Sequence, residues 1–150
     1  MQPETIHKSD IEHLREWFRD CPALQEDSRF NVDFLAGNPT EYALYQVPST
    51  LQYRENVLGE RLLRDVQTID FIFASRESYS SDTVENMANA QFYEAVLQWI
   101  LQQNKSRNYP EINGGEVRSI VPTLTAYPAD IGSDAAKYQI QLEISYRIKE

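Results

Sequence analysis

The C-terminal segment of the chain, residues 137–149, alternates without interruption between apolar and polar side chains. Its apolar series consists of Tyr138, Ile140, Leu142, Ile144, Tyr146 and Ile148. A repeat of two residues predicts an antiparallel β-strand with one face on a hydrophobic core and the other in water. Because the segment is longer than the usual strand of about five or six residues, it must either pair along its whole length or leave an open edge for another chain.

The length of the chain, 150 residues, and its hydrophobic content of 41% fit one ordinary domain, residues 1–150. A domain of this size buries enough surface to need no disulfide or metal. Cys21 is the single cysteine, so an internal disulfide and a cysteine metal cluster are excluded. No His or Lys stands close to it in sequence to lower its pKa, which favours a packing role over a reactive thiol.

The formal net charge of -9 disfavours nonspecific nucleic-acid binding, which depends on Lys and Arg at phosphates. The nearest approach to a basic cluster is a mixed-charge series: Arg54, Glu55, Glu60, Arg61, Arg64 and Asp65. No stretch approaches the roughly 20 apolar residues of a membrane-spanning helix, and residues 1–4 lack the features of a signal peptide. We therefore expect no membrane segment and a protein made and used in a cytoplasm.

Two helices are predicted by capping boxes that precede apolar residues at helical spacing. The first, Ser9–Asp20, opens with Ser9 and Glu12, and the second, which ends at about Gln103, opens with Asp82 and Glu85. The second helix is the longer and should cover the sheet. Its apolar stripe comprises Val84, Ala88, Phe92, Ala95, Val96 and Trp99, with Met87 and Ile100 beside it.

The remaining apolar segments predict strands. Phe30–Phe34 and Tyr42–Val47 are expected to form a hairpin around the turn at 36–39. Residues 65–75 contain the run Phe71–Ala74, which is apolar on both faces and indicates a central strand, covered by a helix and on its other face by a neighbouring subunit. Residues 117–126 and 137–149, linked by 128–134, predict a C-terminal β-hairpin. The order indicates an α+β fold: a mixed or antiparallel sheet with a main helix packed on one face, a short N-terminal helix and a C-terminal β-hairpin.

Residues 49–64 are the least regular part of the chain, because their apolar residues are spread among charges and Gly59 interrupts them. We interpret this segment as an extended hairpin or a long loop. A long excursion from a compact domain is usually functional or disordered.

The sequence offers no convincing catalytic, metal or cofactor site. His7 and His13 lack the spacing of a zinc pair, and the chain contains neither a phosphate-binding glycine loop nor a nucleophile elbow. Asp130 and Asp134 lie in a loop that faintly resembles a cation-binding turn, although turn formation explains them better. The tyrosines Tyr42, Tyr45, Tyr53 and Tyr79 fit half-buried strands or a protein interface. We therefore predict that the protein is not an enzyme and holds no cofactor.

Several short motifs, spread over nearly the whole chain, form a recognisable pattern. They are Cys21-Pro22, 31–33, 71–79, Asn86, 92–94, Trp99, Gln103-Asn104 and 137–141. The pattern resembles a family of small proteins from phages and prophages of Gram-positive bacteria that are labelled minor capsid proteins. Members resemble tail-terminator, or tail-completion, proteins in fold and position. These motifs are structural, and none of them is catalytic.

The resemblance implies a structural virion protein, assembled in the bacterial cytoplasm. It would form a hexameric ring at the head-proximal end of a phage tail tube and join the tube protein to the head connector. DNA would pass through the lumen without specific binding. Another neck or head–tail connector protein remains an alternative, as does, from a different class, a small ligand-binding α+β domain or enzyme.

A ring needs a surface that meets a different surface on the next copy. The irregular segment could reach a neighbour or the lumen, and the terminal strand could extend a sheet across the joint. The candidate subunit or lumen contacts are Tyr53, Arg54, Glu55, Glu60 and Arg61. A deletion of Gln52–Gly59 is expected to leave a folded monomer that no longer assembles.

Overall fold

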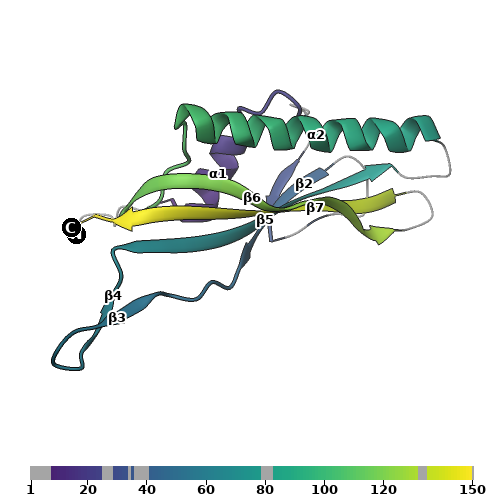
Figure 1. The fold of residues 1–150 in the computed structure, drawn as a ribbon. Coiled ribbons are helices and arrows are strands. Elements are labelled where there is room, and N and C mark those ends of the chain that lie inside the picture. The colour runs from purple at the N-terminus through teal and green to yellow at the C-terminus, as the bar shows by residue number, and fades with distance from the viewer. Residues whose placement is uncertain are drawn as a thin grey trace, which may run out of the picture.

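The computed structural model describes residues 8–24, 29–33, 35, 41–78, 83–131 and 135–149. Its elements are, in chain order, α1 (Asp10–Phe18), β1 (Phe30–Val32), β2 (Glu41–Val47), β3 (Tyr53–Glu55), β4 (Arg61–Leu63), β5 (Val66–Ser78), α2 (Thr83–Ser106), β6 (Gly115–Ile131) and β7 (Ala135–Ile148). Five strands form the main sheet in the order β1-β2-β5-β7-β6, and β3 and β4 form a separate pair. Both helices lie on one side of the main sheet (Figure 1). The fold is therefore α+β, as the sequence predicted.

The terminal strand β7 is an interior strand. It pairs in antiparallel fashion with β5 over residues 135–147 and with β6 over residues 136–148. Of the two alternatives that the sequence left open, pairing along the whole length is the one observed, and the predicted C-terminal hairpin is confirmed. The expectation that this strand extends a sheet into a neighbouring copy is wrong, because both of its edges are already hydrogen-bonded.

The pairing of β1 and β2 differs from the expected hairpin. The two strands are parallel, with Phe30 opposite Tyr42 and Val32 opposite Leu44. Asp33 follows β1 in the left-handed region at φ 57°, and its N–H donates to the carbonyl of Leu44 at 2.9 Å. The turn residues 36–39 lie outside the described part of the chain. A turn signal predicts a change of chain direction, but it does not fix which way the flanking strands then pair.

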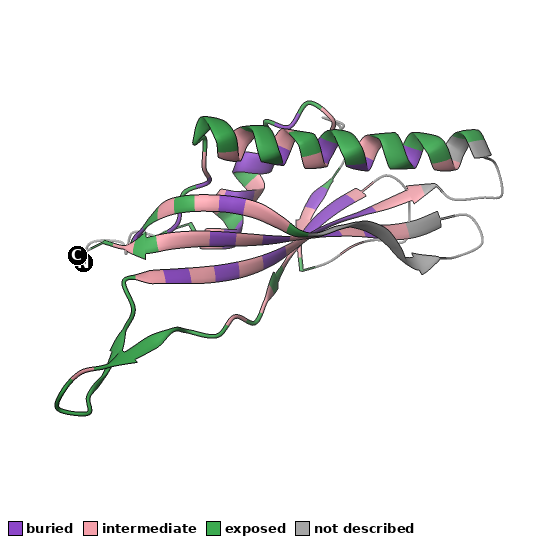
Figure 2. Cartoon of the chain, viewed as in Figure 1, coloured by how far each residue is buried: buried purple, intermediate pink, exposed green. Residues whose placement is uncertain are grey.

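The core lies between the sheet and the two helices, and it is built from alternate residues of the strands (Figure 2). Its fully buried large side chains include Phe18 of α1 and Ile100 of α2, together with Tyr42, Leu44, Phe71, Phe73, Ile140, Leu142 and Ile144 of the sheet. Phe18 stacks on Phe73 with ring centroids 4.9 Å apart. The predicted central position of β5 is confirmed, because it is third of the five strands.

Helix α1 begins as predicted, with the N–H of Glu12 donating to the Ser9 hydroxyl at 3.4 Å. This bond satisfies one of the free N–H groups at the helix start. The second predicted cap, Asp82, lies outside the described residues.

The buried face of α2 differs from the predicted stripe. Asn89, Tyr93, Val96 and Ile100 are buried on it. Four members of the predicted face are instead exposed: Val84, Met87, Ala88 and Ala95. The shift arises because two polar-tipped residues belong to the buried face. The hydroxyl of Tyr93 is hydrogen-bonded to that of Ser75 on β5, so the polar end of the Tyr93 side chain is satisfied although it is buried.

Helix α2 also continues past the predicted end at Gln103, to Ser106. Arg107 then adopts a left-handed conformation with φ 60°. The N–H of Asn108 donates to the carbonyl of Gln103 at 2.9 Å, and that of Arg107 to Asn104 at 3.2 Å. This pair of bonds is a Schellman motif, a common helix end that usually has glycine at the left-handed position.

Strand β6 forms one edge of the sheet and is blocked against further pairing along part of its length. It continues to Ile131, well past the predicted end at Ala126, and its register with β7 slips at four places. Its outward N–H at Ile120 donates to the side-chain carbonyl of Asn104 at 3.0 Å, and Pro122 has no N–H. Bulges, proline and covering side chains are devices that protect sheet edges.

Candidate functional site: the β3–β4 arm

The segment that the sequence left open between a hairpin and a loop is a hairpin, and it projects from the domain. We call residues 50–65 the arm. Tyr53 lies opposite Leu63, Arg54 opposite Leu62 and Glu55 opposite Arg61. The arm leaves the sheet on the side opposite to α2 (Figure 1), and β3 and β4 pair only with each other among the described strands. All five candidate contact residues are on this arm, and all are exposed.

The tip of the arm is organised by Asn56, the one residue of 51–65 that is partly buried. Its side-chain oxygen accepts from the N–H of Leu58 at 2.9 Å and from that of Glu60 at 3.0 Å. Its carbonyl accepts from the N–H of Gly59 at 3.0 Å. Gly59 has φ +82°, which a side chain would strain. These bonds hold Val57 and Leu58 outward at a defined turn.

The root of the arm is fixed by Gln67, a residue of β5 that is only 1% exposed. Its side-chain oxygen accepts from the N–H of Gln52 at 2.9 Å. Its side-chain nitrogen donates to the carbonyls of Gln52 at 2.8 Å and Arg64 at 2.9 Å. The buried amide thereby joins the two strands of the arm to the sheet, so the direction of the arm is set by the fold.

The pleat of the hairpin separates charges that are mixed in the sequence. Successive residues of a strand point to opposite faces, and the register then places Arg54 and Leu62 on one face. Tyr53, Glu55, Arg61 and Leu63 share the other face. There the guanidinium of Arg61 lies over the Tyr53 ring, 4.6 Å from its centroid.

The arm also carries most of the large exposed apolar side chains among the described residues. Six of the nine large exposed apolar side chains among the described residues belong to it: Leu51, Tyr53, Val57, Leu58, Leu62 and Leu63. Val57 is 102% exposed and Leu58 is 78% exposed. Single exposed apolar residues are ordinary, but a concentrated set marks an interaction surface.

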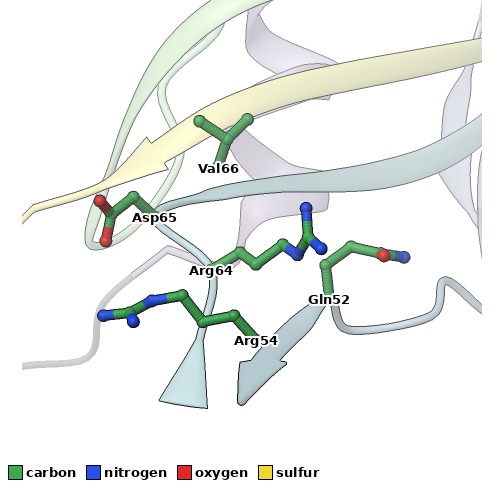
Figure 3. A pocket seen from close by; sticks show the side chains of 5 residues that line it. All are labelled: Gln52, Arg54, Arg64, Asp65 and Val66. Carbon is green, nitrogen blue, oxygen red and sulfur yellow. The ribbon is translucent and has the colours of Figure 1, made fainter. Parts of the chain in front are cut away.

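An open recess lies where the arm meets the sheet. It has a volume of about 620 Å³ and is lined by Gln52, Arg54, Arg64, Asp65 and Val66 (Figure 3). Four of these residues are exposed and Val66 is partly buried. A small-molecule site usually encloses most of its ligand within apolar walls. This recess gives a ligand little shielding from water, and it suits a side chain of another protein better.

The other residues that the sequence considered have structural surroundings. Cys21 is 2% exposed, and burial raises the pKa of its thiol, which keeps it protonated and unreactive. Tyr42 is buried in the core, whereas Tyr45 is partly buried beneath the ammonium of Lys137, 4.9 Å from the ring centroid. His13 lies 3.2 Å from the Asn113 side-chain oxygen.

Within the described ranges, no three His, Cys, Asp or Glu side chains gather as a metal site would require. His7, Tyr79 and Asp134 lie outside the described residues, as does the side chain of Asp130.

The sequence did not single out the residues that shape the arm. Gln67 reads as an ordinary polar strand residue, and its role appears only when its burial is known. Asn56 followed by Gly59 was the available signal, since Asn and Gly favour tight turns.

Comparisons with known proteins leave the family of the chain open: no protein-family model matches it, and no curated protein matches it. In the part of the chain that the structure describes, neither helix combines the length and the apolar character needed to span a bilayer.

Proposed function

We propose that this protein is a structural virion subunit, a tail terminator that forms a ring at the head-proximal end of a phage tail tube and joins the tube to the head connector. The observation that carries the proposal is the arm, a hairpin with a fixed direction and exposed apolar residues at its tip. The resemblance of the sequence motifs to phage minor capsid proteins gives the proposal its biological setting. On this proposal the protein has no catalytic activity.

The arm needs a partner for physical reasons. Burying an apolar side chain contributes roughly 1.5–3 kcal/mol, and the arm leaves six large ones in water. Its direction is already fixed by Gln67, so little ordering remains to oppose association. A rigid projection with an apolar tip is suited to insertion into a second protein.

The proposed partners are other copies of the chain, in a hexameric ring, together with the tail tube protein and the head connector. The ring would be assembled in the bacterial cytoplasm and remain in the virion. With a net charge of -9, a lumen lined by this protein would repel passing DNA and keep it from adhering. Another head–tail connector would use the same arm, and attachment to purified tubes rather than to heads distinguishes the two roles.

The first experiment removes the apolar tip. Replacing Val57 and Leu58 by serine keeps the Asn56–Gly59 turn, and the mass in solution is compared with that of the wild-type chain, alone and with purified tail tubes. The control replaces Met87 and Leu101 by serine in the same way. These two residues are 56% and 43% exposed on α2. We expect rings or tube-bound particles from the wild type and the control, and monomers from the tip variant. Equal assembly of all three proteins would show that the arm tip is not part of the interface.

The second experiment shortens the arm. The N–H of Arg64 donates to the carbonyl of Gln52 at 2.9 Å, so these two residues can flank a two-residue Asn-Gly turn in place of residues 53–63. Gln52 is kept because Gln67 bonds its backbone, which makes this deletion cleaner than one that begins at Gln52. The variant should fold as a monomer and leave tubes uncapped in electron micrographs. Capped tubes would contradict the proposal.

A further inference from the structure

The face of the main sheet opposite the helices carries an unneutralised pair of carboxylates. Asp70 of β5 lies directly across from Glu143 of β7. Val47 of β2 flanks Asp70, and Val121 of β6 flanks Glu143. We call these four residues the acceptor row. All four are partly buried, although neither of the described helices covers this face of the sheet (Figure 1).

Among the described residues, the immediate neighbours of the acceptor row along its strands provide no counter-charge. Along the strands its neighbours on the same face are Thr68 and Ile72 on β5, and Gln141 and Ser145 on β7. Neither Asp70 nor Glu143 takes part in a salt bridge with a described residue. Asp70 instead contacts the Ser49 hydroxyl, 3.5 Å from its Oδ2 atom. Like charges directly opposite in a sheet are destabilising, so the row is suited to receiving a cation.

The arm carries a cation with matching properties. Arg61 lies over the Tyr53 ring, and Nε of Arg64 donates to the Tyr53 carbonyl at 3.1 Å. Arg54 is exposed, and its guanidinium has neither a hydrogen bond nor an ion pair with a described residue. The register puts Leu62 on the same face. A guanidinium beside a leucine complements two carboxylates flanked by valines, because its planar fork can bond both carboxylates at once.

We propose that the arm of one copy docks on the acceptor row of the next, with Arg54 between Asp70 and Glu143 and Leu62 against the two valines. This inference rests on the ring assembly proposed above. The occupant of this sheet face is therefore a second copy of the chain. At about 3.3 Å per residue, Arg54 lies about 7 Å beyond the root of the arm at Gln52, and the tip at Leu58 lies about 20 Å beyond it, so the sheet of the next copy would pack against the base of the arm. Each copy gives one arm and receives one, which is the head-to-tail interface that closes rings.

The test is a charge reversal with rescue. The arm variant is Arg54→Glu, the acceptor variant is Asp70→Lys with Glu143→Lys, and the rescue variant carries all three changes in one chain. The acceptor variant keeps a like-charge pair, so the repulsion between positions 70 and 143 is retained, while the contact of Asp70 with the Ser49 hydroxyl is lost. Lys105→Glu, in the last turn of α2, applies the same charge change as the arm variant on the other side of the sheet. Thermal unfolding checks that each variant folds, and sedimentation measures assembly.

We expect the arm variant and the acceptor variant each to assemble at least about tenfold more weakly, since one lost charge contact of this kind exceeds about 1.4 kcal/mol. The rescue variant should assemble as the wild type does. If the wild type assembles and either single-side variant is unaffected, or rescue fails, this docking mode is overturned while the proposed ring stands. A wild type that stays monomeric, alone and with tail tubes, overturns both. Assembly abolished by a chelator would assign the carboxylates to a metal ion instead.

Discussion

The side chain of Gln67 holds the backbone of Gln52 at both of its polar groups, accepting from the N–H at 2.9 Å and donating to the C=O at 2.8 Å. In a β-sheet, the backbone of a neighbouring strand forms the same two bonds to the N–H and C=O of a residue. One buried amide thus replaces the next step of a β-ladder, at the point where the arm turns away from the sheet.

Replacing Gln67 by glutamate should destabilise the protein and loosen the arm. The carboxylate can still accept from Gln52, but it cannot donate to the carbonyls of Gln52 and Arg64. Two acceptors then lose their donor beside a buried charge, which costs about 2–4 kcal/mol in free energy of unfolding. Urea titration measures the loss, and hydrogen exchange of the Gln52 and Arg64 amides reports the loosening.

The matched control is Gln52→Ala. That side chain makes only a bond of 3.2 Å to the Thr50 carbonyl, and the backbone groups held by Gln67 remain. We expect a change within about 0.5 kcal/mol. Equal stability of the two variants would show that the Gln67 amide does not anchor the arm.

Arg107→Gly should stabilise the protein. Arg107 occupies the left-handed position of the Schellman motif with φ 60°, where a Cβ atom costs about 1–2 kcal/mol. Glycine removes that strain, but it also increases the conformational entropy of the unfolded chain, which offsets part of the stabilisation. The net increase should be about 0.5–1 kcal/mol, which calorimetry detects as a higher melting temperature. Arg107→Ala keeps the Cβ atom, so a similar rise in that variant would point to the lost charge instead.

The stability of the protein should fall above about pH 10. Burial raises the pKa of Tyr93 far above its ordinary value of 10.0, and its hydroxyl is bonded to that of Ser75. The folded state therefore retains a proton that the unfolded state releases. This contribution is complete below pH 10 and decreases as the pH rises further, by at most about 1.4 kcal/mol per pH unit for this one group.

Tyr93→Phe removes that part of the alkaline slope, and it costs about 1–3 kcal/mol at neutral pH because Ser75 loses its partner. Adding Ser75→Ala should recover much of the loss, since both partners are then apolar. Urea titrations at neutral pH and above pH 10 measure both effects. An unchanged slope in Tyr93→Phe would assign the alkaline loss to other groups.

The parts of the fold that follow a simple period could be predicted from the sequence. Strict alternation identified β7, and the apolar run Phe71–Ala74 identified β5 as central. The buried face of α2 could not be found in this way, because Asn89 and Tyr93 occupy core positions. An apolar pattern assigns those positions to the apolar residues beside them. The parallel direction of β1 depends on the path of the chain after Asp33, which short-range turn signals do not determine.

The candidate site was predicted as a segment but not as a surface. The charges of Arg54 and Glu55 cancel in the sequence, and only the pleat of the hairpin places them on opposite faces. The acceptor row also exists only in the three-dimensional structure. Asp70 and Glu143 are 73 positions apart along the chain and become opposite neighbours only through the β5–β7 register.

The blocked edge of β6 limits how molecules of this protein can associate. With Ile120 covered by Asn104 and Pro122 unable to donate, neighbouring copies cannot readily fuse into one continuous backbone ladder along this stretch. Contacts between copies along this stretch would then rely on side chains, whose charged members respond to ionic strength. An assembly joined by such charged contacts would weaken as salt is added, whereas a continuous backbone ladder between copies would grow towards a fibre.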